Sequence, residues 1–227
     1  MGILQPKVSR KWRYGFVLLQ VIDDILDGHR LTDESPLEIV GRFKKQIIEQ
    51  QYDNDLWGNL IKELMLAYQN DPNCSDARFK ILNVIDNMIL DYHRRIEKQI
   101  WTEKQLVQHH RETFTPSLNL LFMSIGSSSR INSIPEFIDL MGWCSVIRDL
   151  QDDMSRGLIN IPIDYNSIEK RNDWIVTQVS KAKINWELTH KKLGNLDPQA
   201  QKTVRLFLKS SEKYLRIKNF KTFENQI

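Results

Sequence analysis

Cysteine is scarce in this chain of 227 residues, which contains only Cys74 and Cys144. Neither cysteine has a spacing to histidine or to the other cysteine that is typical of a zinc site, and two thiols do not suggest a disulfide framework. The sequence therefore predicts reduced thiols in a cytoplasmic protein, and we expect no catalysis by cysteine.

Long apolar runs and long basic runs are missing as well. No stretch approaches the roughly 20 apolar residues needed to cross a bilayer, and residues 1–10 lack the apolar segment of a signal peptide. The formal net charge is only +3, and no Lys/Arg run suggests a surface for nucleic acid. We expect a cytoplasmic protein without a nucleic-acid partner, with peripheral contact to a membrane as a further option.

Glycine and proline are also few, with 9 and 7 residues, whereas hydrophobic residues make up 41%. Apolar residues recur with helical spacing and no strand-like alternation competes, so the pattern predicts an all-α protein. The length suits one domain covering residues 1–227. Pro116 falls inside the fifth predicted helix and should kink it. The predicted helices span residues 9–28, 36–50, 54–70, 76–98, 102–125, 134–156, 168–193 and 198–218.

Two acidic motifs stand inside these predicted helices. The first motif comprises Asp23, Asp24 and Asp27, and the second comprises Asp149, Asp152 and Asp153. Helical spacing puts the three carboxylates of each motif on one face. Mg²⁺ prefers carboxylate oxygens and completes its shell with water and substrate phosphates. The two motifs therefore predict a small Mg²⁺ cluster that binds a diphosphate, with all six carboxylates around one cavity.

The alternative is that both motifs are solvated helix faces. Like charges on one turn destabilise a helix by a few tenths of a kcal/mol per pair, so something should compensate for them. In the second motif, Arg148 and Arg156 flank Asp152 and could form an Arg-Asp-Arg ladder without any metal. The first motif follows Leu19 and Gln20 and has no such help upstream, which favours a functional role.

The second motif and the residues after it resemble the squalene/phytoene synthase family. Residues 145–153, SVIRDLQDD, and 156–162, RGLINIP, are similar in order and spacing to a signature of that family. Residues 21–27, VIDDILD, resemble its first aspartate-rich motif, and residues 85–91, IDNMILD, resemble its intervening element. The resemblance covers nearly the whole chain. It implies an all-α bundle of the class I isoprenoid synthase type with a central cavity.

The resemblance also implies a reaction. Family members ionise a prenyl diphosphate with Mg²⁺ and join two prenyl diphosphates head to head, so we expect Mg²⁺ as cofactor and a C15 or C20 prenyl diphosphate as substrate. Arg148 would be a permanently charged donor to the diphosphate. The residues implied in catalysis are Asp23, Asp24, Asp27, Arg148, Asp149 and Asp153, with Asp152 as a further metal ligand. Those implied in substrate binding are Tyr14, Gln20, Phe114, Ser117, Leu118, Ser145 and Tyr214.

An apolar chamber should shield the carbocation that forms when diphosphate leaves. Its expected walls are Phe16, Leu19, Phe114, Leu118, Leu121, Phe122, Met141 and Trp143. The histidines are expected to be surface or capped residues rather than metal ligands. They are His93, His109 and His110.

Departures from the family pattern keep other functions open. Gln20 replaces an arginine, Ser145 an asparagine and Asn160 a tyrosine, and the chain also looks shorter at both ends, where Lys218 or Lys221 could supply a basic ligand. One alternative is a terpene synthase that converts a single prenyl diphosphate. Another is a non-catalytic binding or assembly protein derived from the family. Condensation of two substrates is placed first because the second motif matches that branch best, and a monomer or a homodimer is expected.

Overall fold

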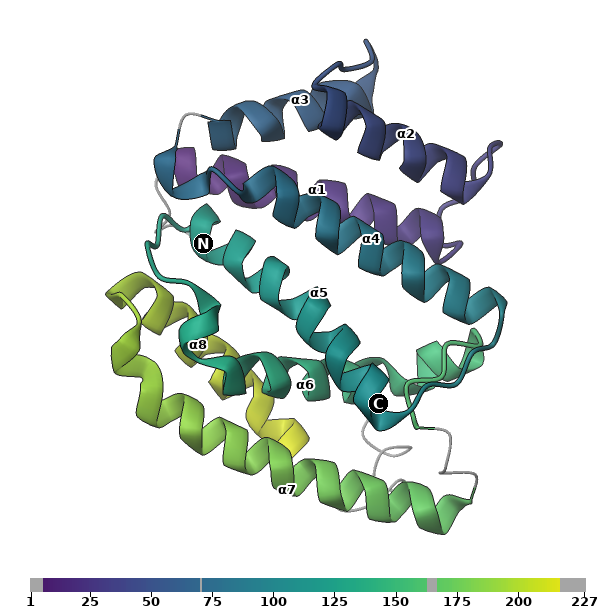
Figure 1. Ribbon diagram of the computed structural model, residues 1–227, viewed down its shortest axis with the longest axis vertical. Helices are drawn as coiled ribbons and strands as arrows, with labels where there is room; N and C mark the ends of the chain where they lie inside the picture. The colour runs from purple at the N-terminus through teal and green to yellow at the C-terminus, as the bar shows by residue number, and fades with distance from the viewer. Residues whose placement is uncertain (1–5, 70, 163–166, 217–227) are drawn as a thin grey trace. The chain divides into compact units, whose positions relative to one another are not determined.

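The computed structural model describes residues 6–69, 71–162 and 167–216 (Figure 1). Over these residues the chain forms eight α-helices and no strand, so the all-α prediction is confirmed. The helices are α1 (Pro6–Leu26), α2 (Pro36–Glu49), α3 (Leu56–Gln69), α4 (Ala77–Ile96), α5 (Glu103–Ser124), α6 (Pro135–Ser155), α7 (Ile168–Lys192) and α8 (Pro198–Ser211).

The observed bounds lie within three residues of the predicted ones for the first seven helices. The last predicted helix is wrong at its end, because α8 stops at Ser211 and the chain continues as the 3-10 helix η4 (Glu212–Arg216). Proline occupies the start of α2, α6 and α8, where its missing N–H has no intrahelical acceptor. Asp197 also caps α8 by accepting from the main-chain N–H groups of Gln199 and Ala200 at 3.1 and 3.0 Å.

The chain divides into two compact units. Unit 1 comprises residues 1–93 and 116–128, and unit 2 comprises residues 94–115 and 129–227. Helix α5 therefore contributes to both units, and Pro116, which lies inside α5 as predicted, is its first residue in unit 1. The single domain expected from the sequence stays a prediction.

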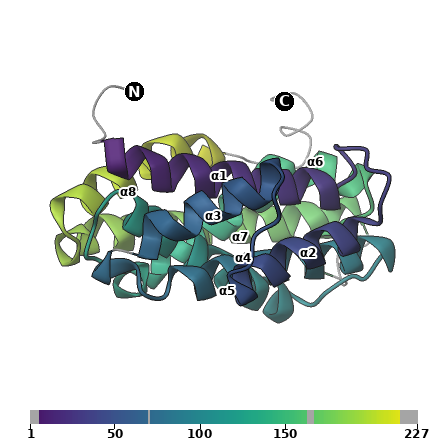
Figure 2. The same ribbon diagram turned by 90° about the horizontal axis from the view of Figure 1, so that it is seen from above.

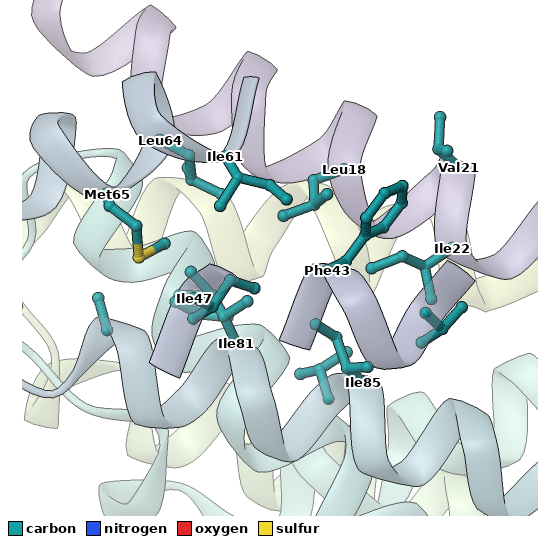
Figure 3. Packing of buried hydrophobic residues seen from close by; sticks show 14 of the residues in the cluster. Leu18, Val21, Ile22, Phe43, Ile47, Ile61, Leu64, Met65, Ile81 and Ile85 are labelled. Atoms are coloured by element: carbon teal, nitrogen blue, oxygen red, sulfur yellow. The ribbon is translucent and has the colours of Figure 1, made fainter. Parts of the chain in front are cut away.

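Unit 1 has a core of aliphatic side chains from α1 to α4. Helices α2 and α3 lie against α1 (Figures 1 and 2), and Figure 3 shows Leu18, Phe43 and Ile85 from three of these helices in one apolar cluster. In α1 the fully buried Leu18 and Ile22 are four residues apart, which sets its inner face. The first acidic motif begins directly after Ile22, and its three carboxylates are half-buried at the edge of this face.

Unit 2 is built around α6, α7 and α8. Helix α7 lies along α6 (Figure 1), and the rings of Trp143 and Trp174 meet edge to face between these helices, with centroids 5.9 Å apart. Ile147 and Leu150 of α6 are fully buried. Their burial fixes the rotation of α6 and leaves the second acidic motif, at the end of the same helix, half-buried to exposed.

Among the residues that the structure describes, no helix has both the length and the apolar content that crossing a membrane requires.

Candidate functional site

The first acidic motif occupies the C-terminal end of α1. The main-chain N–H of Asp27 donates to the oxygen of Asp23 at 2.8 Å, so the helical turn continues through Asp27. Gly28 then takes a positive φ of 76°, a conformation that glycine adopts without steric cost. The helix ends there, and the main-chain N–H of Arg30 donates to the main-chain oxygen of Asp24 at 2.9 Å. The backbone of this motif is therefore helical, as the prediction of three carboxylates on one helix face requires.

Gln20 contacts the first motif directly. It lies one turn before Asp24, and its side-chain N–H donates to Asp24 Oδ1 at 3.0 Å. Gln20 thus binds a motif carboxylate through a neutral amide. Arg30, the nearest arginine after the motif, instead places its guanidinium 5.1 Å from the centre of the Trp57 ring.

The second acidic motif lies in the last two turns of α6. Arg148 binds Asp149 through two parallel hydrogen bonds, Nε to Oδ1 at 2.7 Å and Nη2 to Oδ2 at 2.6 Å. These hydrogen bonds raise the pKa of Arg148, so the guanidinium stays charged. Arg156 contacts Asp152 at 3.2 Å. The predicted ladder around Asp152 is therefore wrong for Arg148, which pairs with its own neighbour Asp149.

Asp153 accepts a hydrogen bond from Asn160, which in turn is bound by Arg94, and the sequence predicted neither contact. Asn160 donates its side-chain N–H to Asp153 Oδ2 at 2.9 Å. The oxygen of the same amide accepts from Arg94 Nη2 at 3.1 Å. Arg94 is 1% exposed. The signal available in the sequence was Asn160, which replaces the tyrosine expected from the resemblance, whereas nothing in the helical pattern distinguishes Arg94 from a surface arginine.

Both motifs stand where a helix disfavours negative charge. The unsatisfied carbonyls at a helix C-terminus act as about half a negative charge, so a carboxylate there costs about 0.3–1 kcal/mol. Within the described chain, the last turns of α1 and α6 contain no Lys, Arg or His. Arg156 follows α6 and offsets part of the charge of its motif. An added cation would relieve the remaining repulsion at both helix ends.

The donor atoms of the motifs fit Mg²⁺. All six side chains are carboxylates, which are hard oxygen ligands of the type that this ion takes. No three His, Cys, Asp or Glu side chains of the described residues are already gathered as a metal-binding group. Mg²⁺ does not require such a group, since it is usually held by one or two carboxylates, several waters and the phosphates of the substrate.

The predicted substrate-binding residues differ in burial. Leu118 is buried, with 4% exposure, while Tyr14, Phe114, Ser117, Ser145 and Tyr214 are half-buried and Gln20 is exposed. In unit 2 the Tyr214 phenol contributes electrostatically to the raised pKa of Arg148, after the larger effect of the hydrogen bonds that Arg148 donates to Asp149. Of these residues, Gln20 is hydrogen-bonded to a motif carboxylate.

The residues predicted to form the chamber walls also differ in burial. Phe122 is fully buried and Trp143 is 7% exposed, whereas Phe16 is 55% exposed. Leu19, Leu121 and Met141 are half-buried. Trp143 borders a cavity of about 120 Å³ in unit 2, together with His110, Trp174 and Asn160.

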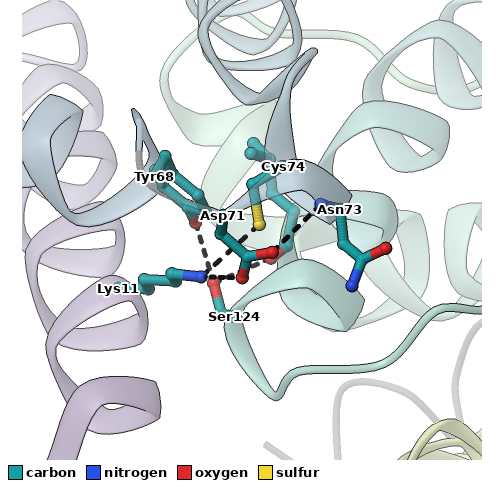
Figure 4. A network of polar contacts seen from close by, with 7 residues as sticks. Lys11, Tyr68, Asp71, Asn73, Cys74 and Ser124 are labelled. Atoms are coloured by element: carbon teal, nitrogen blue, oxygen red, sulfur yellow. Dashed lines mark hydrogen bonds and ion pairs between the residues drawn. The ribbon is translucent and has the colours of Figure 1, made fainter.

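Tyr14 borders a larger cavity, of about 480 Å³, in unit 1. One side of this cavity is formed by Lys11, which pairs with Asp71 and lies 3.5 Å from Cys74 Sγ (Figure 4). Burial raises the pKa of Cys74 to about 11 and that of Tyr68 to about 12, so both groups stay protonated at neutral pH. The Tyr68 hydroxyl meets the Ser124 hydroxyl at 2.8 Å. These polar contacts join α1 to the segment that follows α3, and α3 to α5, within unit 1.

The histidines were expected to be surface or capped residues, and His109 is not at the surface. This side chain is 5% exposed and meets the Trp101 ring edge to face, with centroids 5.3 Å apart. His93 is exposed, and His110 is half-buried against Gly142. Lys218 and Lys221 lie outside the described residues.

Comparisons of the chain with protein-family models, with curated proteins and with solved structures found no match in any of the three.

Proposed function

We propose that this protein is a Mg²⁺-dependent prenyltransferase of the squalene/phytoene synthase type with a class I isoprenoid synthase fold. In this proposal it ionises a C15 or C20 prenyl diphosphate and joins two of them head to head, releasing diphosphate. The observation that carries the proposal is the position of both acidic motifs at helix C-termini. A carboxylate in the last turn of a helix costs about 0.3–1 kcal/mol, and bound cations would offset this cost.

The two motifs would supply the metal ligands, with Asp23, Asp24 and Asp27 on α1 and Asp149, Asp152 and Asp153 on α6. Mg²⁺, when bound, neutralises the charge of a diphosphate and makes it a better leaving group. Arg148 already presents two donors in the fork that suits an anionic oxygen pair, and Asp149 occupies that fork in the structure. In the proposed reaction Arg148 exchanges Asp149 for diphosphate oxygens.

The chain's apolar and aromatic residues would then protect the allylic cation from water. Trp143 and Trp174 offer ring faces and edges in unit 2, and aromatic faces attract cations. Phe114 and Leu118 are further candidates from α5. The hydrocarbon product would be strongly apolar, which is the reason for proposing peripheral contact with a membrane.

A single-substrate terpene synthase is the second candidate. The hydrogen bond between Gln20 and Asp24 favours it, because a neutral amide occupies the place of the family's arginine and adds no positive charge for a second diphosphate. Two diphosphates in one site need compensation, since buried charge without a partner costs several kcal/mol.

The test is a product analysis. The purified protein is incubated with Mg²⁺ and C10, C15 or C20 prenyl diphosphates, and the hydrocarbons are identified by mass spectrometry. We expect a product with twice the carbons of one substrate, and none in the presence of a chelator. A product with the carbons of one substrate would support the terpene synthase. Absence of turnover with every substrate would reject both enzymes and favour a binding protein.

A further inference from the structure

Arg94 is an unusual residue for the interior of a helical protein. It lies in the last turn of α4 and is the largest of the fully buried side chains among the described residues. Its guanidinium carbon stands 3.8 Å from the centre of the Trp101 ring, and its Nη2 donates to the oxygen of Ile159 at 3.2 Å. Arginine is almost never fully buried unless its charge is paired and hydrogen-bonded. The contacts of the Arg94 guanidinium must therefore compensate for the cost of burying its charge.

The hydrogen bonds of Arg94 fix the orientation of the Asn160 amide. A guanidinium can only donate, so the Asn160 atom at 3.1 Å from Arg94 Nη2 must be the acceptor oxygen. The amide nitrogen then faces the other way, where it donates to Asp153 Oδ2 at 2.9 Å. Asparagine suits this position because it accepts from a cation on one side and donates to a carboxylate on the other. A carboxylate at position 160 could not donate to Asp153.

We propose that Arg94 is a positioning residue that holds the Asp153 carboxylate in its metal-binding orientation through the Asn160 amide. The inference rests on the proposed function, in which Asp153 is a metal ligand. It adds a role for two residues that lie outside both acidic motifs. Partners that orient a metal ligand in this way contribute typically 10- to 100-fold to metal affinity.

The test measures metal binding without turnover. Mn²⁺, which takes the same oxygen ligands as Mg²⁺, is titrated with inorganic diphosphate present, and free Mn²⁺ is followed by electron paramagnetic resonance. We expect Arg94→Met and Asn160→Leu each to weaken Mn²⁺ binding by about 10- to 100-fold. Arg94 and Asn160 act through one chain of hydrogen bonds. The double variant should therefore bind Mn²⁺ with about the same affinity as the single variant that binds it less tightly.

Arg111→Met is the matched control. Arg111 belongs to the same unit and binds Asp139 through two hydrogen bonds of 2.7 Å each, but it is not hydrogen-bonded to Asn160 or Asp153 in those contacts. Its removal should leave Mn²⁺ affinity unchanged. Circular dichroism and the urea midpoint establish that each variant is folded. If Arg94→Met does not fold, the Mn²⁺ affinity of Asn160→Leu tests the positioning role. In Asn160→Leu the contacts of Arg94 with Trp101 and Ile159 remain.

A second measurement reports the orientation of the amide itself. In the metal-free protein, the side-chain ¹⁵N–¹H₂ signal of Asn160 should shift in Arg94→Met and stay in place in Arg111→Met. Folded Asn160→Leu protein with wild-type Mn²⁺ affinity would overturn the positioning role while leaving the proposed function standing. A wild-type protein that binds no Mn²⁺ with diphosphate would overturn the proposed function and the positioning role together.

Discussion

Asp24 illustrates how a single carboxylate can oppose stability and serve function. It stands in the last turn of α1, at the negative end of the helix dipole, and accepts from Gln20. Asp24→Asn keeps the shape and the hydrogen-bond acceptor while removing the charge. We expect the free energy of unfolding of the metal-free variant to rise by about 0.3–1 kcal/mol, as measured by urea unfolding.

The same variant should lose activity. Metal stabilisation of a leaving group contributes several kcal/mol, and each 1.36 kcal/mol is tenfold in rate, so turnover should fall at least about 100-fold. Asp173→Asn on the exposed surface of α7 is the control, with neither gain in stability nor loss of activity expected. A fully active Asp24→Asn variant would contradict the assignment of Asp24 to the metal.

Gln20 allows the two candidate reactions to be separated. Gln20→Arg would place a positive charge beside Asp24, where the structure has a neutral amide at 3.0 Å. If the protein joins two substrates, the added charge supports the second diphosphate, and the doubled product should be preserved or increased. Mass spectrometry of products from wild type and variant measures this. A variant that still forms only the one-substrate product would argue for the terpene synthase.

Asp71 gives a pH-dependent contribution to stability. The hydrogen bond from Lys11 lowers the pKa of the Asp71 carboxyl in the folded protein. A carboxyl with a depressed folded pKa stabilises the protein above its unfolded pKa of about 3.9, and this stabilisation is lost as the pH falls through the folded value. When the pH is lowered from 6 into the acid range, we expect the free energy of unfolding of Asp71→Asn to fall less than that of wild type. Urea midpoints across that range measure the difference, and parallel curves would contradict it.

At the scale of single helices, two glycines of unit 1 should respond oppositely to alanine. A Cβ at Gly58 in α3 would stand 2.1 Å from the main-chain oxygen of Asp53, whereas a Cβ at Gly41 in α2 would meet nothing within 4 Å. Gly41→Ala should raise the free energy of unfolding by about 0.5–1 kcal/mol, since glycine is a poor helix former. Gly58→Ala should lower it, because the backbone of the turn must move. Equal effects in urea unfolding would refute this.

Most helix bounds could be predicted because they depend on neighbours in sequence. Proline at the start of α2, α6 and α8 and the cap formed by Asp197 are local signals. The end of α8 carried no such signal, since the chain there tightens into η4 without glycine or proline. Sequence periodicity therefore identified the elements of unit 1 and unit 2 but not every terminus.

The site was predictable only in part, for the same physical reason. The motif carboxylates share a helix face through fixed spacing, which a sequence shows. The links from Arg94 to Asn160 and from Asn160 to Asp153 span 66 and 7 residues and depend on tertiary packing. The burial of His109 was not predictable for a similar reason, because it depends on packing that includes the Trp101 ring.

At the scale of the whole molecule, the proposal requires carboxylates from both units, since Asp24 belongs to unit 1 and Asp149 to unit 2. Mg²⁺ with inorganic diphosphate should therefore slow amide hydrogen exchange at the C-terminal ends of both α1 and α6. Ligands that bind only the folded state stabilise it by mass action. Hydrogen exchange followed by mass spectrometry measures each end separately. Protection at one motif alone would contradict a shared diphosphate.

The interleaved composition of the units has a consequence for biosynthesis. Unit 1 lacks its last segment until residue 128 has been made, although its first segment ends at residue 93. At about 5–20 residues per second, those 35 residues (128 − 93) take roughly 2–7 s to translate. For most of this interval the nascent chain carries α1 to α4 without Leu120 and Met123, the α5 residues that complete their apolar cluster. The apolar cluster of unit 1 should therefore stay incomplete in the nascent chain until α5 has been made.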